Sequence, residues 1–320
     1  MLYDSQNILW SSKLDNDPFS DLLRLADAKA TVSGSFTAGG SWAIRFPRPD
    51  YLKFFALLKG WCWLRLEGEE HSIRVEEGDV LLLSIQRPFV LSGDLEADPL
   101  DAKDLFAGNI NKTAVLGQGE DCIQIGGHVR LEPTAGEFVT RMLPPLIHIQ
   151  AASTQATVMK WLLGQLVRER MEKLPGISVV SDHLTQLLFI QILRVYLETS
   201  DTMPCGWLRL ANDKRFAPAI ALMHGNPGRT WQLGELAKAT AMSRTSFAVN
   251  FRSVAGVTPL AYLTQWRMLL AQRALRTEDS TLAQLAGRLG YSSESAFSNA
   301  FKRVTGISPA HYRRQSRISQ

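Results

Sequence analysis

Cysteine is scarce in this chain, and the few cysteines are not arranged in pairs. Cys62, Cys122 and Cys205 are scattered over 320 residues without a Cys-x-x-Cys motif. An odd number at these spacings argues against a disulfide framework and against a structural zinc site. The length favours about two domains of roughly 100–200 residues each. The apolar residues, 45% of the chain, are enough for two cores.

The chain also lacks a long apolar run and a secretion signal. Its longest apolar stretch, residues 184–197, is interrupted by Gln186, Gln191 and Arg194, which argues against a membrane span. Its N-terminus, MLYDSQNILW, has neither a basic n-region nor an apolar h-region. We therefore expect a cytoplasmic protein with no part in a membrane.

Charge is distributed unevenly along the chain. Residues 1–206 carry 19 Lys and Arg against 26 Asp and Glu, whereas residues 207–320 carry 16 against 5, a net charge of +11. A basic segment of this size beside an acidic one is typical of phosphate binding confined to one end of a protein. The split predicts nucleic acid as the partner of the C-terminal part.

The basic part contains the same pattern twice, in residues 233–259 and 282–309. The matching positions lie 49 residues apart before the turn and 50 residues apart after it, so the slip of one residue falls inside the turn. The pairs are Leu233 and Leu282, Leu236 and Leu285, Ala237 and Ala286, Phe247 and Phe297, Phe251 and Phe301, Gly256 and Gly306, and Pro259 and Pro309.

Each copy predicts a helix-turn-helix motif. A short helix leads into a tight turn, an N-capping serine (Ser243; Ser292 or Ser293), and a helix with Phe at positions i and i+4. The second helix of such a motif enters the DNA major groove. Between the copies, Thr258 and Pro259 predict the start of a rigid helix that ends near Arg276. An architectural or RNA-binding module is the alternative, but the narrow A-form major groove does not admit such a helix.

The N-terminal part is expected to be rich in β-strands from residue 31 to about 130. Short β-prone runs separated by glycine and acidic turn residues predict an antiparallel sandwich or small barrel. These runs are residues 51–58, 61–66, 71–75 and 80–85.

A helical period replaces the strand pattern after residue 153. One helix is expected around Val158, Trp161 and Leu166, and Asp182 is expected to cap a second helix that ends near Glu198. The apolar stripe of the second helix either covers the sandwich or forms a dimer interface. That stripe consists of Leu184, Leu187, Leu188, Ile192 and Val195. Residues 199–206, with Pro204, predict an interdomain linker.

A known family shares these features. The matching residues are Ala237, Met242-Ser243-Arg244, Phe247, Phe251, Gly256, Pro259, Tyr262-Leu-Thr-Gln-Trp-Arg267, Ile307-Ser-Pro309 and Tyr312-Arg-Arg314. On these residues, 212–315 resemble the DNA-binding domain of the AraC/XylS family of bacterial transcription regulators. The preceding part resembles a branch of that family with a cupin-like jelly-roll sensing domain, on Gly78–Leu83 and Met142–His148.

The resemblance implies an α+β multidomain protein. A cupin-like β jelly roll occupies residues 1–150, a helical dimerisation segment and linker residues 151–206, and an all-α domain of two helix-turn-helix motifs joined by a long helix residues 207–320. The implied partners are double-stranded DNA, a small-molecule effector, a second copy of the chain and RNA polymerase. The implied function is sequence-specific transcription regulation without catalysis or a cofactor. A cupin-type enzyme fused to a DNA-binding domain is the weakest alternative.

Two features depart from the family's pattern. Metal-dependent cupins carry a His-x-His pair and a Glu on facing strands, but Arg87-Pro88-Phe89 follows Gly78 here, and His71, His128 and His148 lack ligand spacing. We therefore expect no metal site. The second departure is Ala241, because the corresponding residue of the second copy is Gly290 and the position requires φ > 0. Alanine there is expected to cost about 1 kcal/mol.

The family's pattern also implies which side chains contact DNA. Groove-facing positions fall on Arg244, Thr245, Ala248 and Val249 in the first copy and on Glu294, Ser295, Ser298 and Asn299 in the second. Thr245, Ala248 and Val249 can contact thymine methyls, Asn299 can bind adenine through two hydrogen bonds, and Glu294 can accept from cytosine. Arg244 can reach guanine or phosphate. Lys302, Arg303, Arg313 and Arg314 are expected at phosphates, which position the protein without reading sequence.

Three ways of sensing remain open for the N-terminal part. A small molecule could bind in the jelly roll near Trp42, Phe54, Trp61, Trp63 and Phe89. A redox signal could act through Cys62, Cys122 or Cys205, although buried cysteines are usually inert. Dimerisation alone is the third alternative. The sequence does not distinguish activation from repression.

Overall fold

The structure is a computed structural model of the whole chain, and it describes residues 17–107, 113–153, 156–199, 203 and 205–318. The chain forms two compact units: one joins 1–27, 132–142 and 202–320, and the other joins 28–131 and 143–201. These units differ from the expected division into 1–150, 151–206 and 207–320. The reason is that α1 (Pro18–Leu25) and α3 (Pro133–Met142) pack on the C-terminal helices.

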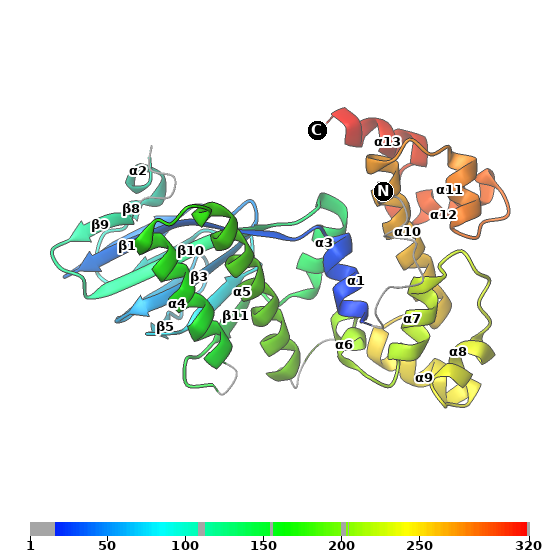
Figure 1. Cartoon of the computed structure of the whole chain (residues 1–320), viewed down its shortest axis with the longest axis horizontal. Helices are drawn as coiled ribbons and strands as arrows, with labels where there is room; N and C mark the ends of the chain where they lie inside the picture. The colour runs from blue at the N-terminus through cyan, green and yellow to red at the C-terminus, as the bar shows by residue number, and fades with distance from the viewer. Residues whose placement is uncertain (1–16, 108–112, 154–155, 200–202, 204, 319–320) are drawn as a thin grey trace. The chain divides into compact units, whose positions relative to one another are not determined.

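The second unit is a sandwich of two β-sheets, as expected (Figure 1). The strand order is β11-β6-β3-β10-β1-β9 in one sheet and β5-β4-β7-β2-β8 in the other. Only β1 with β9 and β2 with β8 are parallel among the described pairs. The strands are β1 (Lys29–Gly39), β2 (Ala43–Phe46), β3 (Leu52–Lys59), β4 (Trp61–Leu66), β5 (Ile73–Glu76), β6 (Val80–Leu83), β7 (Phe89–Ser92), β8 (Leu100–Asp101), β9 (Thr113–Gly117), β10 (Cys122–Arg130) and β11 (Leu146–Ile149). A short helix, α2 (Ala102–Leu105), follows β8.

Alternating side chains from both sheets form the core of the sandwich. Phe36 and Phe55 from one sheet meet Leu64 and Leu91 from the other in one buried cluster. Successive residues of a strand point to opposite faces, so every second residue enters this core. The expected turn at Gly78 is present, with φ +84°. Beside it, the buried Asp79 carboxylate accepts hydrogen bonds from the Glu76 and Ala151 amides and from His148.

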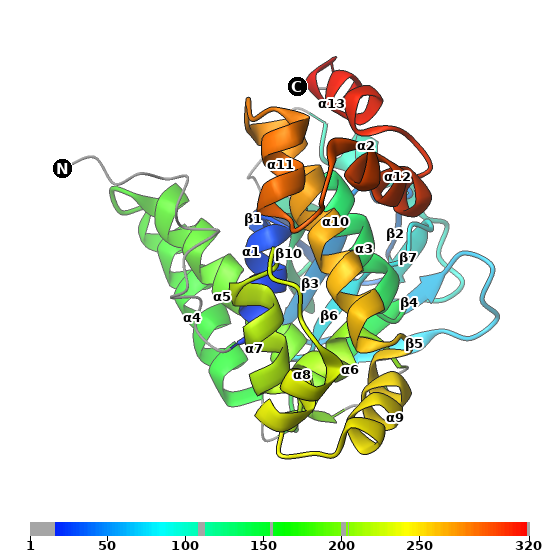
Figure 2. The ribbon, with the colours of Figure 1, turned by 90° about the vertical axis from the view of Figure 1, so that its right-hand side faces the viewer.

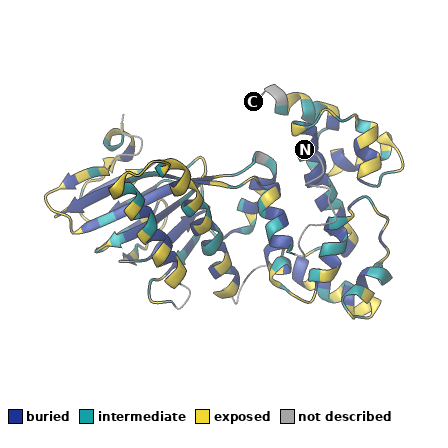
Figure 3. Cartoon of the chain, viewed as in Figure 1, coloured by how far each residue is buried: buried dark blue, intermediate teal, exposed yellow. Residues whose placement is uncertain are grey.

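Helices α4 (Ala156–Glu172) and α5 (Ile177–Thr199) lie along one face of the six-stranded sheet (Figure 1). The expected start of the second helix at Asp182 is wrong, because α5 begins at Ile177 and Asp182 lies in its interior. Leu188, Ile192 and Val195 are buried within the chain, whereas Leu187 is 47% exposed. The expected apolar stripe therefore covers the sandwich. Both helices still expose residues on their outer sides (Figure 3).

The first unit contains the two expected helix-turn-helix motifs, formed by α8 with α9 and by α11 with α12. The long helix α10 runs between them (Figure 2). Ser243, Thr258 and Ser293 cap α9, α10 and α12 as expected. The helices are α6 (Trp207–Asn212), α7 (Ala217–Gly225), α8 (Leu233–Ala239), α9 (Arg244–Ala255), α10 (Pro259–Thr277), α11 (Leu282–Arg288), α12 (Glu294–Thr305) and α13 (Pro309–Ile318).

The turns of the two motifs have the expected left-handed residue. Ala241 has φ +54° and Gly290 has φ +76°. The two turns thus share one backbone conformation, although only glycine adopts it without strain. Half of the linker predicted at residues 199–206, namely 200–202 and 204, lies outside the described residues.

Candidate nucleic-acid interface and ligand cavity

Helices α9 and α12 bury one face and expose another. Phe247 and Phe251 of α9 are buried, and so are their counterparts Phe297 and Phe301 of α12. These rings fix each helix to its motif with the opposite face outward. The expected groove-facing residues lie on the outward faces: Arg244, Thr245, Val249, Glu294, Ser295 and Asn299 are exposed, and Ala248 and Ser298 are half-buried. Their contacts with bases stay predictions.

The first copy presents one arginine in a particular way. A Cβ placed on Gly234 of α8 would come within 2.7 Å of Arg244 Nε, so the guanidinium of Arg244 lies against this glycine. The corresponding residue of α11 is Ala283, and Glu294 replaces Arg244 in the second copy. The two recognition helices therefore begin with opposite charges.

The residues expected at phosphates divide into two groups. Lys302, Arg303 and Arg314 are exposed, and Arg314 Nη2 donates to His311 Nδ1 at 3.3 Å. Arg313 is half-buried, and its Nη2 donates to the Ser280 carbonyl at 2.6 Å, which ties α13 to the start of the second motif. Its contact with phosphate stays a prediction. Arg252 was missed, although it is exposed on α9 and stands 50 residues before Lys302. The repeat spacing contained the signal that would have found it.

Arg267 of α10 connects the segment before the first motif to the turn of the second. Its guanidinium donates to the carbonyls of Pro227 and Arg229 at 2.5 and 2.9 Å. It also lies 5.7 Å from the centroid of the Tyr291 ring. A Cβ on Gly290 would come within 2.1 Å of the Gly228 carbonyl oxygen, so these two backbone segments touch. These contacts and α10 hold the two motifs in one arrangement.

A buried polar cluster attaches α1 to the first half of the helical unit. His224 of α7 bonds Asp21 of α1 through Nδ1 and Tyr262 of α10 through Nε2, each at 2.8 Å. Burial lowers the pKa of His224 despite the neighbouring Asp21 carboxylate. The ring is therefore neutral: its Nδ1–H donates to the carboxylate, and Nε2 accepts from the Tyr262 hydroxyl. Trp207 stacks on Tyr262 with ring centroids 4.1 Å apart.

Helix α3 contacts the second half of the same unit. The Glu132 carboxylate pairs with Arg276 of α10, and both side chains are largely buried. The hydroxyls of Thr134 and Tyr312 lie 2.5 Å apart. No local pattern predicts the contacts of α1 or α3, because both helices join the C-terminal helices from distant positions in the chain.

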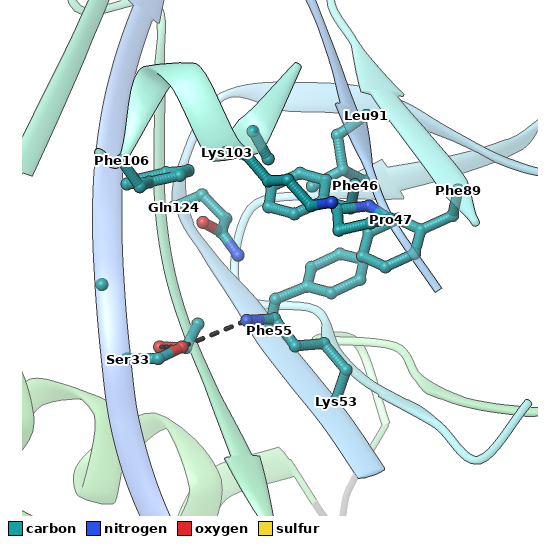
Figure 4. A pocket seen from close by; sticks show the side chains of 13 residues that line it. Ser33, Phe46, Pro47, Lys53, Phe55, Phe89, Leu91, Lys103, Phe106 and Gln124 are labelled. Carbon is teal, nitrogen blue, oxygen red and sulfur yellow. Dashed lines mark hydrogen bonds between the residues drawn. The ribbon is translucent and has the colours of Figure 1, made fainter. Parts of the chain in front are cut away.

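The β unit contains a cavity of about 260 Å³ between its two sheets (Figure 4). Only Phe89 of the five expected aromatic residues lines it. Phe54 is adjacent to the lining residue Phe55, and neighbours on a strand point to opposite faces. Trp42 packs on Phe36, and Trp61 is 40% exposed and packs with Trp63. The cavity is lined by Ser33, Gly34, Phe46, Pro47, Lys53, Phe55, Phe89, Leu91, Ala102, Lys103, Phe106, Gln124 and Gly126.

The histidines and cysteines of the β unit have structural surroundings. His148 Nε2 donates to Asp79 at 2.7 Å, His128 stacks on Tyr51, and His71 is exposed. Among the described residues, no group of three or more His, Cys, Asp or Glu could hold a metal ion. Cys62 and Cys122 are buried and share a hydrogen bond, and this bond together with burial raises the pKa of the Cys62 thiol. Cys205 is exposed.

The fold and this interface define a DNA-binding protein with two helix-turn-helix motifs and a β-sandwich domain. Comparison with known proteins identifies its family. A cupin family model matches residues 17–198, and a helix-turn-helix domain model matches residues 236–315. An AraC-like transcription regulator from Streptomyces antibioticus is 39% identical over 93% of this chain and 98% of its own length. The transcriptional regulator AlkR from Acinetobacter baylyi is 32% identical over 87% of this chain and 92% of its own length.

Among solved structures, the DNA-binding domain of AdpA in complex with a target DNA is 35% identical. The similarity covers 34% of this chain and 97% of that one, with a TM-score of 0.32. The two family models and the near full-length relatives show that this chain belongs to the AraC-like transcription regulators, with a cupin domain followed by a DNA-binding helix-turn-helix domain. Within the described residues, no helix is long and apolar enough to cross a membrane.

Proposed function

We propose that α9 and α12 read two successive major-groove segments on one face of the DNA, and that the β unit controls this binding through a small-molecule effector. The observation that carries the first part is the pair of outward helix faces fixed by α10 and Arg267. The effector part is supported by the cavity between the two sheets. We propose a regulatory function without catalysis.

Salt dependence and point substitutions test the DNA part of this proposal. Binding of the full chain to promoter-length duplexes should weaken steeply with salt, because cations that contact phosphates release counterions from DNA. Arg314→Ala should weaken binding to all sequences nearly equally, since an exposed phosphate contact carries no sequence information. Binding without salt dependence, or binding to RNA as tight as to duplex DNA, would contradict the proposal. A genomic binding map would then give the operator and the target genes.

We also propose that the chain dimerises through the outer sides of α4 and α5. Of the residues first expected there, Leu188, Ile192 and Val195 are buried, but Leu187 is 47% exposed. Val158, Trp161 and Val179 are 48%, 59% and 59% exposed. Exposed apolar residues gathered on neighbouring helices are typical of an interface, and two linked DNA-binding domains would gain occupancy on paired sites. Trp161→Ser with Leu187→Ser should give a folded monomer in sedimentation. A monomeric wild-type chain at micromolar concentration, with and without DNA, would contradict this proposal.

The redox alternative has one supporting observation, the hydrogen bond between the Cys62 and Cys122 thiols. The same bond lowers the pKa of the Cys122 thiol and raises that of Cys62. Burial of both thiols opposes the redox alternative, because the thiolate is the reactive form and a buried thiol is shielded from an oxidant. Cys62→Ala with Cys122→Ala should therefore leave DNA binding unchanged under oxidising and reducing conditions. An oxidant response that this double variant loses would favour the redox alternative instead.

A further inference from the structure

The cavity of the β unit is built mainly from aromatic rings. The Phe89 ring stacks with both Phe46 and Phe55. The ring centroids are 4.8 Å apart for Phe46 and Phe89 and 6.3 Å apart for Phe55 and Phe89. Phe106 lies 6.3 Å from Phe46. Figure 4 shows these four rings around the cavity, with Gln124 and Lys53 between them and Ser33. The volume of about 260 Å³ is near the lower end for small-molecule sites, roughly 300–1,000 Å³.

Lys53 brings a positive charge to this apolar site. Its Nζ donates to the Ser33 hydroxyl at 3.1 Å, and the cavity lining contains Lys103 but no Asp or Glu among the described residues. Burial lowers the pKa of Lys53 to about 8, so the side chain is still mostly charged at pH 7. A buried charge is normally paired with an opposite charge, because desolvation disfavours it otherwise. The Lys53 ammonium therefore has no carboxylate partner among the described residues that line the cavity.

Gln124 is a second polar group that faces the cavity. Gln124 is 4% exposed, and its side chain lies in the cavity wall. A polar group in a mostly apolar cavity wall can fix the orientation of a ligand. The amide can donate one hydrogen bond beside the ammonium of Lys53.

Three properties of the ligand follow from these groups. It carries a negative charge, which compensates Lys53. Its charge is that of a carboxylate rather than a phosphate dianion. The Ser33 hydroxyl donates to the Gly126 carbonyl, and Lys103 lies at the exposed rim. The Lys53 ammonium and the Gln124 amide alone are too few donors for a dianion. The rest of it is apolar and about the size of a ring, because four phenyl rings and a small volume surround it.

We propose that the cavity binds a small monocarboxylic acid with a ring-sized apolar body, whose carboxylate contacts Lys53 and Gln124. This inference names the class of effector and so rests on the proposed effector control. Lys53 and Gln124 fix the position of the acid group, and the stacked phenylalanine rings enclose the body.

Calorimetry with the full chain tests the site. The probes are cyclohexanecarboxylate and phenylacetate, with their neutral amides as matched controls. The acids should bind one site per chain and at least tenfold more tightly than the amides. Lys53→Met keeps the length of the side chain without its charge, and it should weaken acid binding at least tenfold. Lys103→Met, at the exposed rim, should change it less than threefold.

The pH dependence of acid binding provides a second readout. Affinity should fall about tenfold between pH 7 and pH 9, because Lys53 loses its proton over this range and only the ammonium pairs with the acid. His128 lies beside Lys53 on the sheet, and burial lowers its pKa, so it stays neutral throughout. The other charged groups near His128 are Arg130 and Asp182. The Lys53→Met variant should lose the tenfold pH effect.

The outcomes separate this inference from the proposed function. Equal affinity for acids and amides, no binding of either acid, or unchanged affinity in Lys53→Met overturns the inference, while DNA binding can persist. Acid binding that leaves DNA affinity unchanged supports the site and contradicts effector control. Thermal melting checks the fold, and Lys53→Met should melt at the wild-type temperature or above, because it removes a buried charge.

Discussion

The two helix-turn-helix motifs share one backbone and differ in chemistry. α9 presents Arg244, Ala248 and Val249 where α12 presents Glu294, Ser298 and Asn299. The first set offers a cation and apolar contacts, and the second offers groups that form directional hydrogen bonds. The comparison shows that the repeated residues determine the common backbone of the two motifs, whereas their outward residues differ and can make different contacts with DNA. We infer that the second copy carries more of the direct reading of bases.

The supports of the two copies also differ. The first half is held through the buried His224 cluster with α1, and the second half through the contacts of α3 and α13. The turn of the first copy accommodates the Cβ of Ala241. In the second copy, Gly290 lies against the Gly228 carbonyl, which leaves no room for a Cβ. Four pairs of substitutions sharpen these differences.

The largest effect is expected in the turns. Gly290→Ala should lower the free energy of unfolding of the helical unit by about 3 kcal/mol, because the new Cβ adds positive-φ strain and meets the Gly228 carbonyl. Ala241→Gly, the matched change in the first turn, should raise it by about 1 kcal/mol. Denaturant unfolding, with hydrogen exchange as the probe, measures the change in the free energy of unfolding for both variants. Equal and opposite changes would show that the two turns have the same surroundings.

The next effect concerns the buried cluster. His224→Ala should cost about 2–3 kcal/mol, because it leaves the Asp21 carboxylate buried without its main partner. Tyr312→Phe removes one hydroxyl near the second copy and should cost about 1 kcal/mol. Hydrogen exchange should accelerate most in α7 to α9 for the first variant and in α13 for the second. Acceleration spread evenly over both halves would remove the distinction between their supports.

Asn299 and Val249 occupy matching positions of α12 and α9. Asn299→Ala should lose about 2 kcal/mol on the cognate site and relax preference at one base pair, because a bidentate contact is lost. Val249→Ala should lose about 0.5 kcal/mol, since it gives up only apolar contact area. Competition binding over a library of single-base variants measures both losses. Asn299 leaves the base-reading set if its loss is equal on specific and random DNA.

The smallest effect is expected from Gly234. Gly234→Ala should displace the Arg244 guanidinium and weaken DNA binding by about 1 kcal/mol, while the helix itself becomes slightly more stable because alanine favours helices. The reverse substitution in the second copy, Ala283→Gly, should reduce stability slightly without a matching loss of affinity. A Gly234→Ala variant with wild-type affinity would show that Arg244 does not depend on its place against α8.

Local signals predicted the helical motifs well. Ser243, Thr258 and Ser293 cap their helices through contacts three residues away, and the conformation of Ala241 followed from the position of Gly290 in the repeat. The sandwich followed from short strands between turns. Such features depend on neighbouring residues, and a sequence contains them directly.

Features that depend on distant residues were missed. The chemistry of Asp182 suits a cap, but α5 begins at Ile177. For Leu188 and Ile192 the sequence leaves open whether they cover the sandwich or form an interface, because no sequence shows what covers a helix. Of the aromatic residues expected in the pocket, only Phe89 lines it. The sequence does not show which face of each strand turns toward the cavity. The contacts of α1 and α3 join residues separated by more than a hundred positions.

Footprinting on an operator tests the central claim, that both motifs bind DNA together, most directly. Hydroxyl-radical cleavage of the bound duplex should show two protected segments about 10 base pairs apart on one face, because successive major-groove segments recur once per helical turn. Asn299→Ala should weaken protection and base preference in one segment and leave the other in place. A single protected segment, or two segments that lose base preference together in Asn299→Ala, would contradict the account.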